Sequence, residues 1–453
     1  MMRISSARQA AFEILSRVEA GHAFAVDLLQ SRDVDALNEP DRRLTTELVM
    51  GTLRWRGELD YQLERLSGKA LRYFDPEVAI ILRLGIYQIR FLGKIPKSAA
   101  VNEAVELTKA AGKRSAAGLV NAVLRKCPPA KWRGMEAATD EAHAELVAAA
   151  RRAFPAGLIE RWQREYGRGA ADSLALAGLA VPPETLRSVR GNRVEIQQQL
   201  AREGIQTEFG KYSSQALLVR SGNVLASQAF RAGDVVIQDE ASQLVASLVA
   251  PRTGERVLDL CAAPGIKAHQ LAVALGQGTI VACDLSARRL RTMKRLLSGR
   301  IPAGVHFPIV RLDASRELPF ATRFDRILVD VPCSGTGTLA RNPEIKWRLK
   351  PGDLSRLAEL QRSILQNALH LLAPGGRLVY STCSLEAEEN EQVVERVLRE
   401  AKGCHALSGA ELASEFPGLA ALFDSQGYFR TRPDLHAVDG FFAAVISLLR
   451  DSG

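Results

Sequence analysis

The sequence predicts three regions of different fold class: an all-α domain, a small α+β module and a doubly wound α/β domain. Apolar residues recur at helical spacing as far as about residue 127, and from about residue 240 short apolar runs alternate with helical segments. The chain has 453 residues, and because one hydrophobic core stops growing at about 250–300 residues, several domains are expected. A hydrophobic share of 47% and a charged share of 25% argue against a disordered chain or a coiled-coil rod.

The first region, residues 1–130, reads as five successive helices. The first begins behind Ser5 and Ser6, which are possible caps, and the fifth runs from 119 to 126. Proline marks the start of the three helices between them, because it is tolerated in a first helical turn and not in a helix interior. These prolines are Pro40, Pro76 and Pro96, and Pro128-Pro129 ends the run.

The middle of the chain predicts a linker and a small module. Residues 131–154 are rich in Ala and Glu and are expected to be a helical linker. Residues 155–237 are expected to form a small α+β module, with strands at 185–189, 216–220 and 235–238 and a helix at 194–202.

Residues 238–450 predict a parallel doubly wound sheet, because strand–helix alternation is typical of that fold. The expected strands are 257–261, 279–284, 307–312, 324–331, 377–382 and 440–448. Helices are expected at 267–275, from 286, at 355–372 and from 388.

Acidic and small residues follow four of these strands. In a doubly wound sheet ligands bind outside the carboxyl ends of the strands. Small residues between Asp259 and Gly265 allow a backbone to approach a ligand, and Asp284 can accept both hydroxyls of a ribose. Asp313 and Asp330 follow two further strands. The glycine fingerprint of NAD sites is absent, and S-adenosylmethionine has no phosphate and carries a positive sulfonium. A site lined with carboxylates therefore favours S-adenosylmethionine over NAD, although any single Asp could be a helix cap.

The cysteines form no C-x-x-C pair, so neither a metal site nor a disulfide framework is expected. They are Cys127, Cys261, Cys283, Cys333, Cys383 and Cys404. Cys333 and Cys383 follow adjacent strands at the expected ligand edge. A single cysteine there would ordinarily be a packed small hydrophobe, but two beside a methyl donor indicate chemistry.

Two thiols suit the methylation of carbon 5 of cytosine. That carbon is a poor nucleophile until a thiolate adds at carbon 6, after which a base removes the carbon 5 proton and the thiol is expelled. An ordinary thiol is only about 3% ionised at pH 7, so we expect a cation or a helix N-terminus to activate it.

These motifs resemble the Sun (Fmu) family of RNA cytosine-5 methyltransferases, and the resemblance spans nearly the whole chain. The matching segments are Val257-Leu-Asp-Leu-Cys-Ala-Ala-Pro-Gly265 with Lys267, Asp330-Val-Pro-Cys-Ser-Gly335, Tyr380-Ser-Thr-Cys-Ser384 with Glu388-Glu-Asn390, and Asp439-Gly-Phe-Phe442. The helical region resembles the NusB-like domain of the branch that modifies bacterial 16S ribosomal RNA, through Val101–Leu107 and Val120–Arg125. The resemblance implies a Rossmann-like methyltransferase domain preceded by a NusB-like RNA-binding domain and a small RRM-like module.

The resemblance also implies residue roles. Cys383 would be the nucleophile, and Cys333 would aid elimination and product release. In DNA cytosine-5 enzymes the Pro-Cys thiol attacks, which here would be Cys333. Lys267 would lie near the cofactor and the target base. The residues that would hold S-adenosylmethionine are Cys261, Ala262, Ala263, Pro264, Gly265, Ile266, Lys267, Asp284, Asp313 and Asp330.

The chain departs from the family loop Pro-Gly-Gly-Lys-Thr at two positions. Ile266 does not easily adopt a positive φ, and Ala268 lacks the hydroxyl that could cap a helix. We expect weaker cofactor binding with activity retained, because Lys267 and the acids remain.

The composition agrees with a nucleic-acid partner. The formal net charge is +9, and arginine greatly outnumbers lysine. A GC-rich genome would also raise the arginine content. No apolar run reaches the ~18–20 residues that span a bilayer, and no apolar core follows Met1 and Met2, so we expect a cytoplasmic protein without membrane contact. We expect a monomer with no obligate protein partner.

Three functions follow from these observations. The first is methyl transfer to carbon 5 of a cytosine in 16S ribosomal RNA, with the base flipped out of its stack. The second is an RNA-binding assembly factor whose cofactor site is degenerate. The third is a DNA cytosine-5 methyltransferase, which Pro332-Cys333 suggests.

Overall fold

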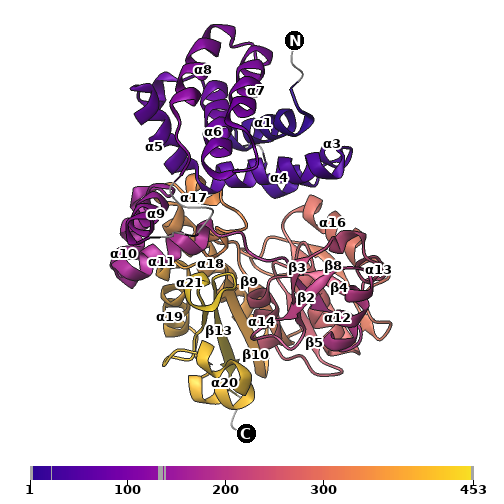
Figure 1. Cartoon of the computed structure of the whole chain (residues 1–453). Coiled ribbons are helices and arrows are strands. Elements are labelled where there is room, and N and C mark those ends of the chain that lie inside the picture. The colour runs from indigo at the N-terminus through magenta and orange to yellow at the C-terminus, as the bar shows by residue number, and fades with distance from the viewer. Residues whose placement is uncertain (1–3, 22, 131–135, 137–138, 450–453) are drawn as a thin grey trace. The chain divides into compact units, whose positions relative to one another are not determined.

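The structure is a computed structural model that describes residues 4–21, 23–130, 136 and 139–449 (Figure 1). The chain forms two compact units. Unit 1 comprises Met1–Val181 and Leu339–Leu349, and unit 2 comprises Pro182–Thr338 and Lys350–Gly453. Of the predicted linker 131–154, residues 131–135 and 137–138 lie outside the described residues, and Asp140–Arg152 forms a helix.

Unit 1 is helical. The five predicted helices are confirmed, and they are α1 (Ser6–Glu19), α4 (Glu39–Arg54), α6 (Pro76–Phe91), α7 (Lys97–Ala110) and α8 (Ala117–Lys126). The remaining helices are α2 (Ala25–Leu29), α3 (Arg32–Asp35), α5 (Arg56–Ser67), α9 (Asp140–Arg152), α10 (Ala156–Tyr166), α11 (Arg168–Leu179) and α17 (Ile345–Arg348). Because α10 and α11 belong to unit 1, the expectation that 155–181 forms part of the α+β module was wrong.

The most apolar stretch of the chain, 78–87, is the core helix of unit 1. Its residues are buried on all sides within α6. Arg83 is buried there and is satisfied by carboxylates, with Nε donating to Asp60 Oδ1 at 2.5 Å and a second contact to Glu19. In the described part of the chain no helix is long and apolar enough to cross a membrane.

Unit 2 begins with a four-stranded antiparallel sheet in the order β2-β3-β1-β4. The chain order is β1 (Thr185–Ser188), α12 (Arg193–Arg202), β2 (Gln206–Phe209), β3 (Ala216–Ser221), α13 (Gln228–Ala232) and β4 (Val235–Ile237). This is the βαββαβ topology of ferredoxin-like folds. An RRM stacks bases on aromatic residues of such a sheet, but β1 and β3 carry none. The RRM-like, RNA-binding character of the module therefore stays a prediction.

The larger sheet of unit 2 has the order β11-β13-β10-β9-β5-β6-β7, with β8 paired to β6 and β12 to β13. The strands are β5 (Arg256–Asp259), β6 (Gly278–Asp284), β7 (Val305–His306), β8 (Ile309–Arg311), β9 (Phe324–Asp330), β10 (Leu372–Thr382), β11 (Cys404–Ala406), β12 (Phe429–Thr431) and β13 (Phe441–Leu448). The pairs from β10 through β9 and β5 to β6 are parallel, as predicted, but β11, β12 and β13 pair antiparallel. The sheet is therefore mixed, because β13 returns from β12 without a crossover helix of the length that parallel pairing needs.

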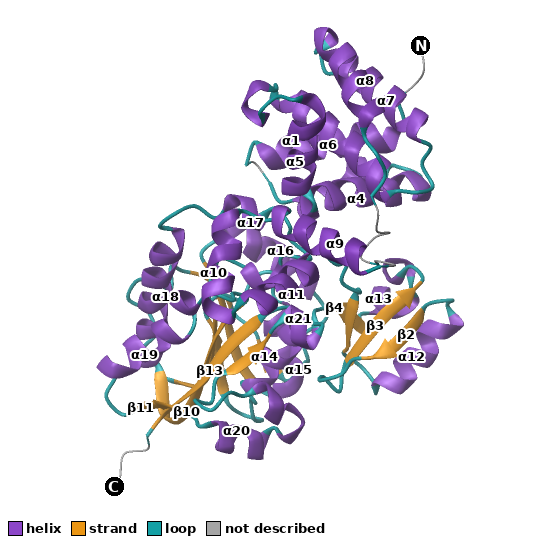
Figure 2. Cartoon of the chain, turned by 60° about the vertical axis from the view of Figure 1, so that its left-hand side comes forward, coloured by secondary structure: helices purple, strands orange, loops and turns teal. Residues whose placement is uncertain are grey.

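Helices cover both faces of this sheet (Figure 2). One apolar core joins the sheet to α18 (Asp353–His370) and α19 (Glu391–Glu400). The other joins it to α14 (Glu240–Leu248), α15 (Ile266–Leu275) and α20 (Gly409–Glu415). Since β5, β6, β9 and β10 are parallel, their carboxyl ends meet at one edge, where the predicted site residues lie.

Candidate active site

The loop between β5 and α15 brings backbone close to the sheet edge. Gly265 is the N-cap of α15 and has a φ of 105°, which favours glycine. A Cβ on Gly265 would meet Met293 Cγ at 2.5 Å, so α15 and α16 (Ala287–Leu297) pack closely only because this residue is small. Ile266 is already the first residue of α15 and needs no positive φ, and Ala268 is buried in the helix. The expectation that Ile266 would be unfavourable at a position of positive φ was therefore wrong.

Three predicted acids lie at the carboxyl ends of strands of the parallel part of the sheet. Asp284 ends β6 and accepts a hydrogen bond from Ser286 N at 2.8 Å. Asp330 ends β9 and accepts from Ser381 Oγ and from Lys267 Nζ, each at 2.8 Å. Asp313 follows β8 and accepts from Ser315 Oγ at 2.6 Å; this hydrogen bond lowers the pKa of its carboxyl.

Asp259 is a further acid of the site, and sequence reasoning used it only to mark a strand end. It ends β5 and is 1% exposed, yet neither oxygen accepts a well-formed hydrogen bond from the described residues. Burial, and next the charge of Asp330, raise the pKa of its carboxyl to about 8. Buried carboxylates are normally paired, so this one is suited to a cationic ligand group. This observation shows that the site fits S-adenosylmethionine, which carries an ammonium and a sulfonium.

The two predicted thiols lie together. Cys333 Sγ and Cys383 Sγ are 3.3 Å apart. The loops that carry them are joined by their backbones, because Gly337 N donates to the Cys383 carbonyl at 2.9 Å. The hydrogen bond with Cys383 and burial raise the pKa of Cys333 well above its ordinary value, so Cys333 stays a protonated thiol at neutral pH. Cys261, by contrast, is held in the loop, where burial and then the negative charges of the nearby acids raise its pKa, so it lacks the activation that a reactive thiol needs.

Lys267 supplies a positive charge between the acids and the thiols. Burial alone would lower the pKa of its ammonium, but the charge and hydrogen bond of Asp330 outweigh burial and the pKa is raised. Charge on Cys383 acts in the same direction, which places the two side chains within electrostatic reach of each other. The ammonium also lies 5.2 Å from the centre of the Phe441 ring. Lys267 therefore remains charged next to the two thiols.

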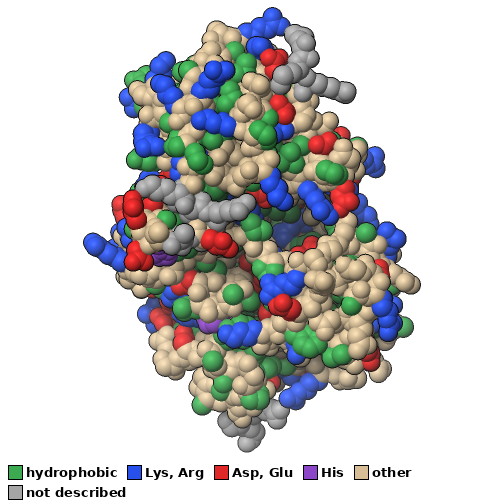
Figure 3. Space-filling model, in the orientation of Figure 1, with side chains coloured by type: hydrophobic (Ala, Val, Ile, Leu, Met, Phe, Trp, Pro, Cys, Tyr) green, Lys and Arg blue, Asp and Glu red, His purple; other side chains and the backbone are tan. Residues whose placement is uncertain are grey.

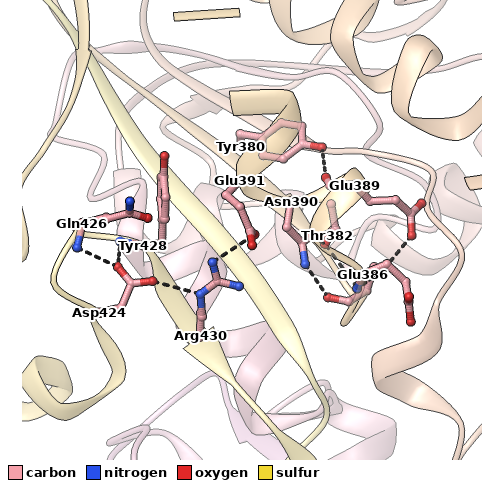
Figure 4. A network of polar contacts seen from close by, with 11 residues as sticks. Tyr380, Thr382, Glu386, Glu389, Asn390, Glu391, Asp424, Gln426, Tyr428 and Arg430 are labelled. Carbon is pink, nitrogen blue, oxygen red and sulfur yellow. Dashed lines mark hydrogen bonds and ion pairs between the residues drawn. The ribbon is translucent and has the colours of Figure 1, made fainter. Parts of the chain in front are cut away.

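The segment after Cys383 is fixed by a buried polar network (Figure 4). Thr382 Oγ1 donates to Asn390 Oδ1 at 2.5 Å, and Asn390 Nδ2 donates to the Ser384 carbonyl at 3.0 Å. Tyr380 Oη donates to the Glu389 carbonyl at 2.5 Å. Among the described residues no group of three or more His, Cys, Asp and Glu side chains is arranged to hold a metal ion.

Known proteins are similar to this chain over its length. The family model described as 16S rRNA methyltransferase RsmB/F matches residues 246–447, and that of the NusB family matches 5–128. A relative from Bacillus subtilis (strain 168), named probable ribosomal RNA small subunit methyltransferase B, is 35% identical over 447 residues, covering 97% of this chain and 98% of its own length. A relative from Pseudomonas putida, named ribosomal RNA small subunit methyltransferase B, is 34% identical and covers 90% of this chain and 92% of its own length. The crystal structure of PH0851 shares the fold, with a TM-score of 0.77, 23% identity and coverage of 98% of this chain and 99% of that one.

The doubly wound sheet and its acid-lined edge define a Rossmann-like methyltransferase that uses S-adenosylmethionine, preceded in the chain by a NusB domain. With relatives of this identity and coverage, the chain belongs to the ribosomal RNA small subunit methyltransferase B family.

Proposed function

We propose that this methyltransferase transfers the methyl group of S-adenosylmethionine to carbon 5 of a cytosine in 16S ribosomal RNA, with Cys383 as the nucleophile. The observation that carries this proposal is the pair of thiols 3.3 Å apart beside a charged lysine and an acid-lined loop. Methylation of a nitrogen or of a ribose oxygen would need no thiol, whereas carbon 5 needs covalent activation.

Each group has a separate task in this proposal. S-adenosylmethionine, held by residues 261–267 with Asp259, Asp284, Asp313 and Asp330, supplies an electrophilic methyl group. The Cys383 thiolate, favoured by Lys267, adds to carbon 6 of the ring, which makes carbon 5 nucleophilic. After methylation a solvent base removes the carbon 5 proton, the ring double bond re-forms and the carbon 6–sulfur bond breaks. Cys333 lies beside the departing sulfur and aids its release.

Basic surfaces support an RNA partner. The helix α16 carries five basic and no acidic residues, and it begins three residues after Asp284. Lys and Arg side chains also lie at several places on the visible surface of the region that contains α7 and α8 (Figure 3). Those that are exposed there are Lys97, Lys109, Arg125 and Lys126. Because phosphate contacts release counterions, we propose that RNA binding weakens steeply with salt.

The direct test compares two cysteine variants in the full chain, with radiolabelled S-adenosylmethionine and 16S ribosomal RNA from cells that lack the enzyme. Cys383→Ala should abolish methyl transfer. Cys333→Ala should accumulate a covalent RNA–protein adduct that survives denaturation, because attack proceeds while release fails. Cys404→Ala, which removes a thiol from β11, is the matched control and should behave as the native protein.

The outcomes separate the alternatives. Normal methylation by Cys383→Ala with none by Cys333→Ala would assign the attack to Cys333, as in DNA enzymes, and would contradict the proposal. Methyl transfer to duplex DNA in preference to the ribosomal RNA would overturn the substrate assignment. Failure to bind S-adenosylmethionine by calorimetry would identify a degenerate site.

A further inference from the structure

Glu389 is a buried carboxylate that joins the two cysteine loops. It is fully buried. Its Oε1 accepts hydrogen bonds from Ser334 N and from Gln361 Nε2, both at 2.9 Å. Its Oε2 accepts from Ser384 Oγ at 2.6 Å and from Ser334 Oγ. Ser334 directly follows Cys333 and Ser384 directly follows Cys383, so one side chain holds the residues adjacent to both thiols.

We infer that Glu389 is a positioning residue that holds the Cys333 thiol at the Cys383 sulfur while the methylated base is released. This inference rests on the function proposed above and adds to it a residue that touches neither substrate nor cofactor. Buried carboxylates need strong compensation, and here four hydrogen bonds from uncharged donors supply it. Hydrogen bonds to an ionised acceptor are about twice as strong as neutral ones, so the charge itself tightens the junction between the loops.

A second contact of the same junction comes from α18. Gln361 Nε2 donates to the Pro332 carbonyl at 2.9 Å as well as to Glu389. Ser334 Oγ and Ser384 Oγ are 3.0 Å apart, so the two serines also meet directly beneath the carboxylate. Cys333 is therefore flanked by residues that are fixed on both sides, which leaves its sulfur little freedom to move away from Cys383.

The chemical consequence is a defined proton path in product release. As the carbon 6–sulfur bond breaks, its electron pair returns to Cys383 Sγ, and the proton on Cys333 Sγ, 3.3 Å away, can move to that sulfur. The carbon 5 proton leaves to solvent water, and Cys333 regains a proton from solvent afterwards. The ionisable groups that face Cys333 are Cys383 from the end of β10, Glu389 from the turn before α19, and Tyr380. After the Cys383 hydrogen bond and burial, the negative charges of Cys383 and Glu389 raise the pKa of Cys333 and keep this proton in place.

The test follows the decay of the covalent adduct in Glu389→Gln. The full chain is mixed with unmodified 16S ribosomal RNA and S-adenosylmethionine, quenched in denaturant at intervals, and the RNA–protein adduct is quantified across pH 6–9.5. The adduct should form in the variant but decay roughly tenfold more slowly, because the amide that replaces the carboxylate cannot accept all of its buried hydrogen bonds. The alkaline limit of decay, which is the pH above which the adduct decays more slowly, should also lie lower than in the native protein, because removal of a nearby negative charge lowers the pKa of the Cys333 thiol.

Two further variants separate charge from architecture. Ser334→Ala keeps the Glu389 charge and removes one donor, so it should slow decay without moving the alkaline limit, and it replaces Glu389→Gln as the test should the latter fail to fold. Glu391→Gln is the matched control, because that carboxylate pairs with Arg430 at 2.9 Å instead of the cysteine loops, as Figure 4 shows. It should leave both the decay rate and the alkaline limit unchanged.

Native decay and a native alkaline limit in Glu389→Gln would overturn the inference, as would equal changes in Glu391→Gln. The absence of any adduct from the native protein and from Cys333→Ala would instead overturn the proposed function, and the two failures are therefore distinguishable.

Discussion

At the scale of residues, two neighbouring acids at the sheet edge differ in the number of hydrogen bonds that they accept. Asp330 has two hydrogen-bond donors, Lys267 and Ser381, whereas Asp259 beside it is buried without a well-formed hydrogen bond. An acid in that state is held partly in its neutral form by desolvation. If the cofactor binds as proposed, its cationic groups would relieve this unpaired state of Asp259, and part of the binding affinity would come from an unfavourable state of the free protein.

This state makes stability depend on pH in a defined direction. The pKa of Asp259 is raised from 3.8 to about 8, so between these values the folded protein holds a proton that the unfolded chain has lost. The free energy of unfolding therefore falls as pH rises through that window. Asp259→Asn should remove this pH-dependent loss of stability. At pH 8.5 its melting temperature should exceed that of the native protein, by roughly 2–4 °C for each kcal/mol gained in the free energy of unfolding. The difference should be smaller at pH 5. Thermal unfolding at both pH values measures it.

The control for this prediction is Asp313→Asn. Hydrogen bonding to Ser315 lowers the pKa of the Asp313 carboxyl. The contribution of Asp313 to the free energy of unfolding is therefore lost only as pH falls through the acid range. It should be the same at pH 5 and at pH 8.5. An Asp259→Asn variant with the same pH dependence as the native protein would show that Asp259 stays ionised. The same variant should bind S-adenosylmethionine more weakly by calorimetry.

At the scale of elements, the close approach of α15 and α16 depends on Gly265. Gly265→Ala would place a methyl group 2.5 Å from Met293 Cγ at a positive φ, and should cost about 2–4 kcal/mol of stability from strain and overpacking together. Gly276→Ala is the matched control at the other end of the same helix, because it also has a positive φ of 67° but would meet nothing within 4 Å. Urea unfolding should show the larger loss for Gly265→Ala, and equal losses would show that packing against α16 is unimportant.

The sequence predicts those elements that begin at a proline or that consist of a run of apolar residues in a buried strand. Prolines at the helix starts predicted α6 and α7, and apolar runs predicted β5, β6 and β9. The pattern failed at β2, which is an exposed edge strand reading Gln-Thr-Glu-Phe, and at α5, which follows α4 without Gly or Pro between them. The positions of the two thiols and of Asp284, Asp313 and Asp330 could be predicted because these residues follow strands that share one edge. Glu389 could not, because its role depends on the meeting of two loops that lie about 50 residues apart in sequence.

At the scale of the whole molecule, the two units interleave along the chain. The segment Leu339–Leu349 follows the Cys333 loop in sequence but belongs to unit 1. Within unit 1 Glu344 Oε1 accepts from Ala25 N at 2.7 Å, and Lys346 Nζ donates to the Arg54 carbonyl at 2.6 Å. Sequence reasoning placed this segment in the methyltransferase domain, because strand–helix alternation continues on either side of it. The helical unit is therefore incomplete without residues drawn from the middle of the catalytic region, and the chain that carries Cys333 continues directly into it.

Lys346 provides the test of this interleaving. Its side chain is fully buried, it lies 3.9 Å from the centre of the Phe154 ring, and it satisfies a carbonyl at the C-terminus of α4. Burial, with the charges of Arg54 and Arg56, lowers the pKa of its ammonium well below the usual range. Lys346→Ala should leave a cavity and cost unit 1 about 2–4 kcal/mol. Lys346→Met should recover most of that loss, because it restores the volume and removes a buried amine.

Calorimetric unfolding of the full chain measures both variants, with Lys350→Ala as the control, since Lys350 is exposed and is the first residue after the segment. The transition of unit 1 should fall in temperature for Lys346→Ala and remain near native for Lys350→Ala. A native transition in Lys346→Ala would show that the segment does not contribute to the core of unit 1. A loss confined to unit 2 would show that the segment belongs to the methyltransferase domain, as its position in the sequence suggests.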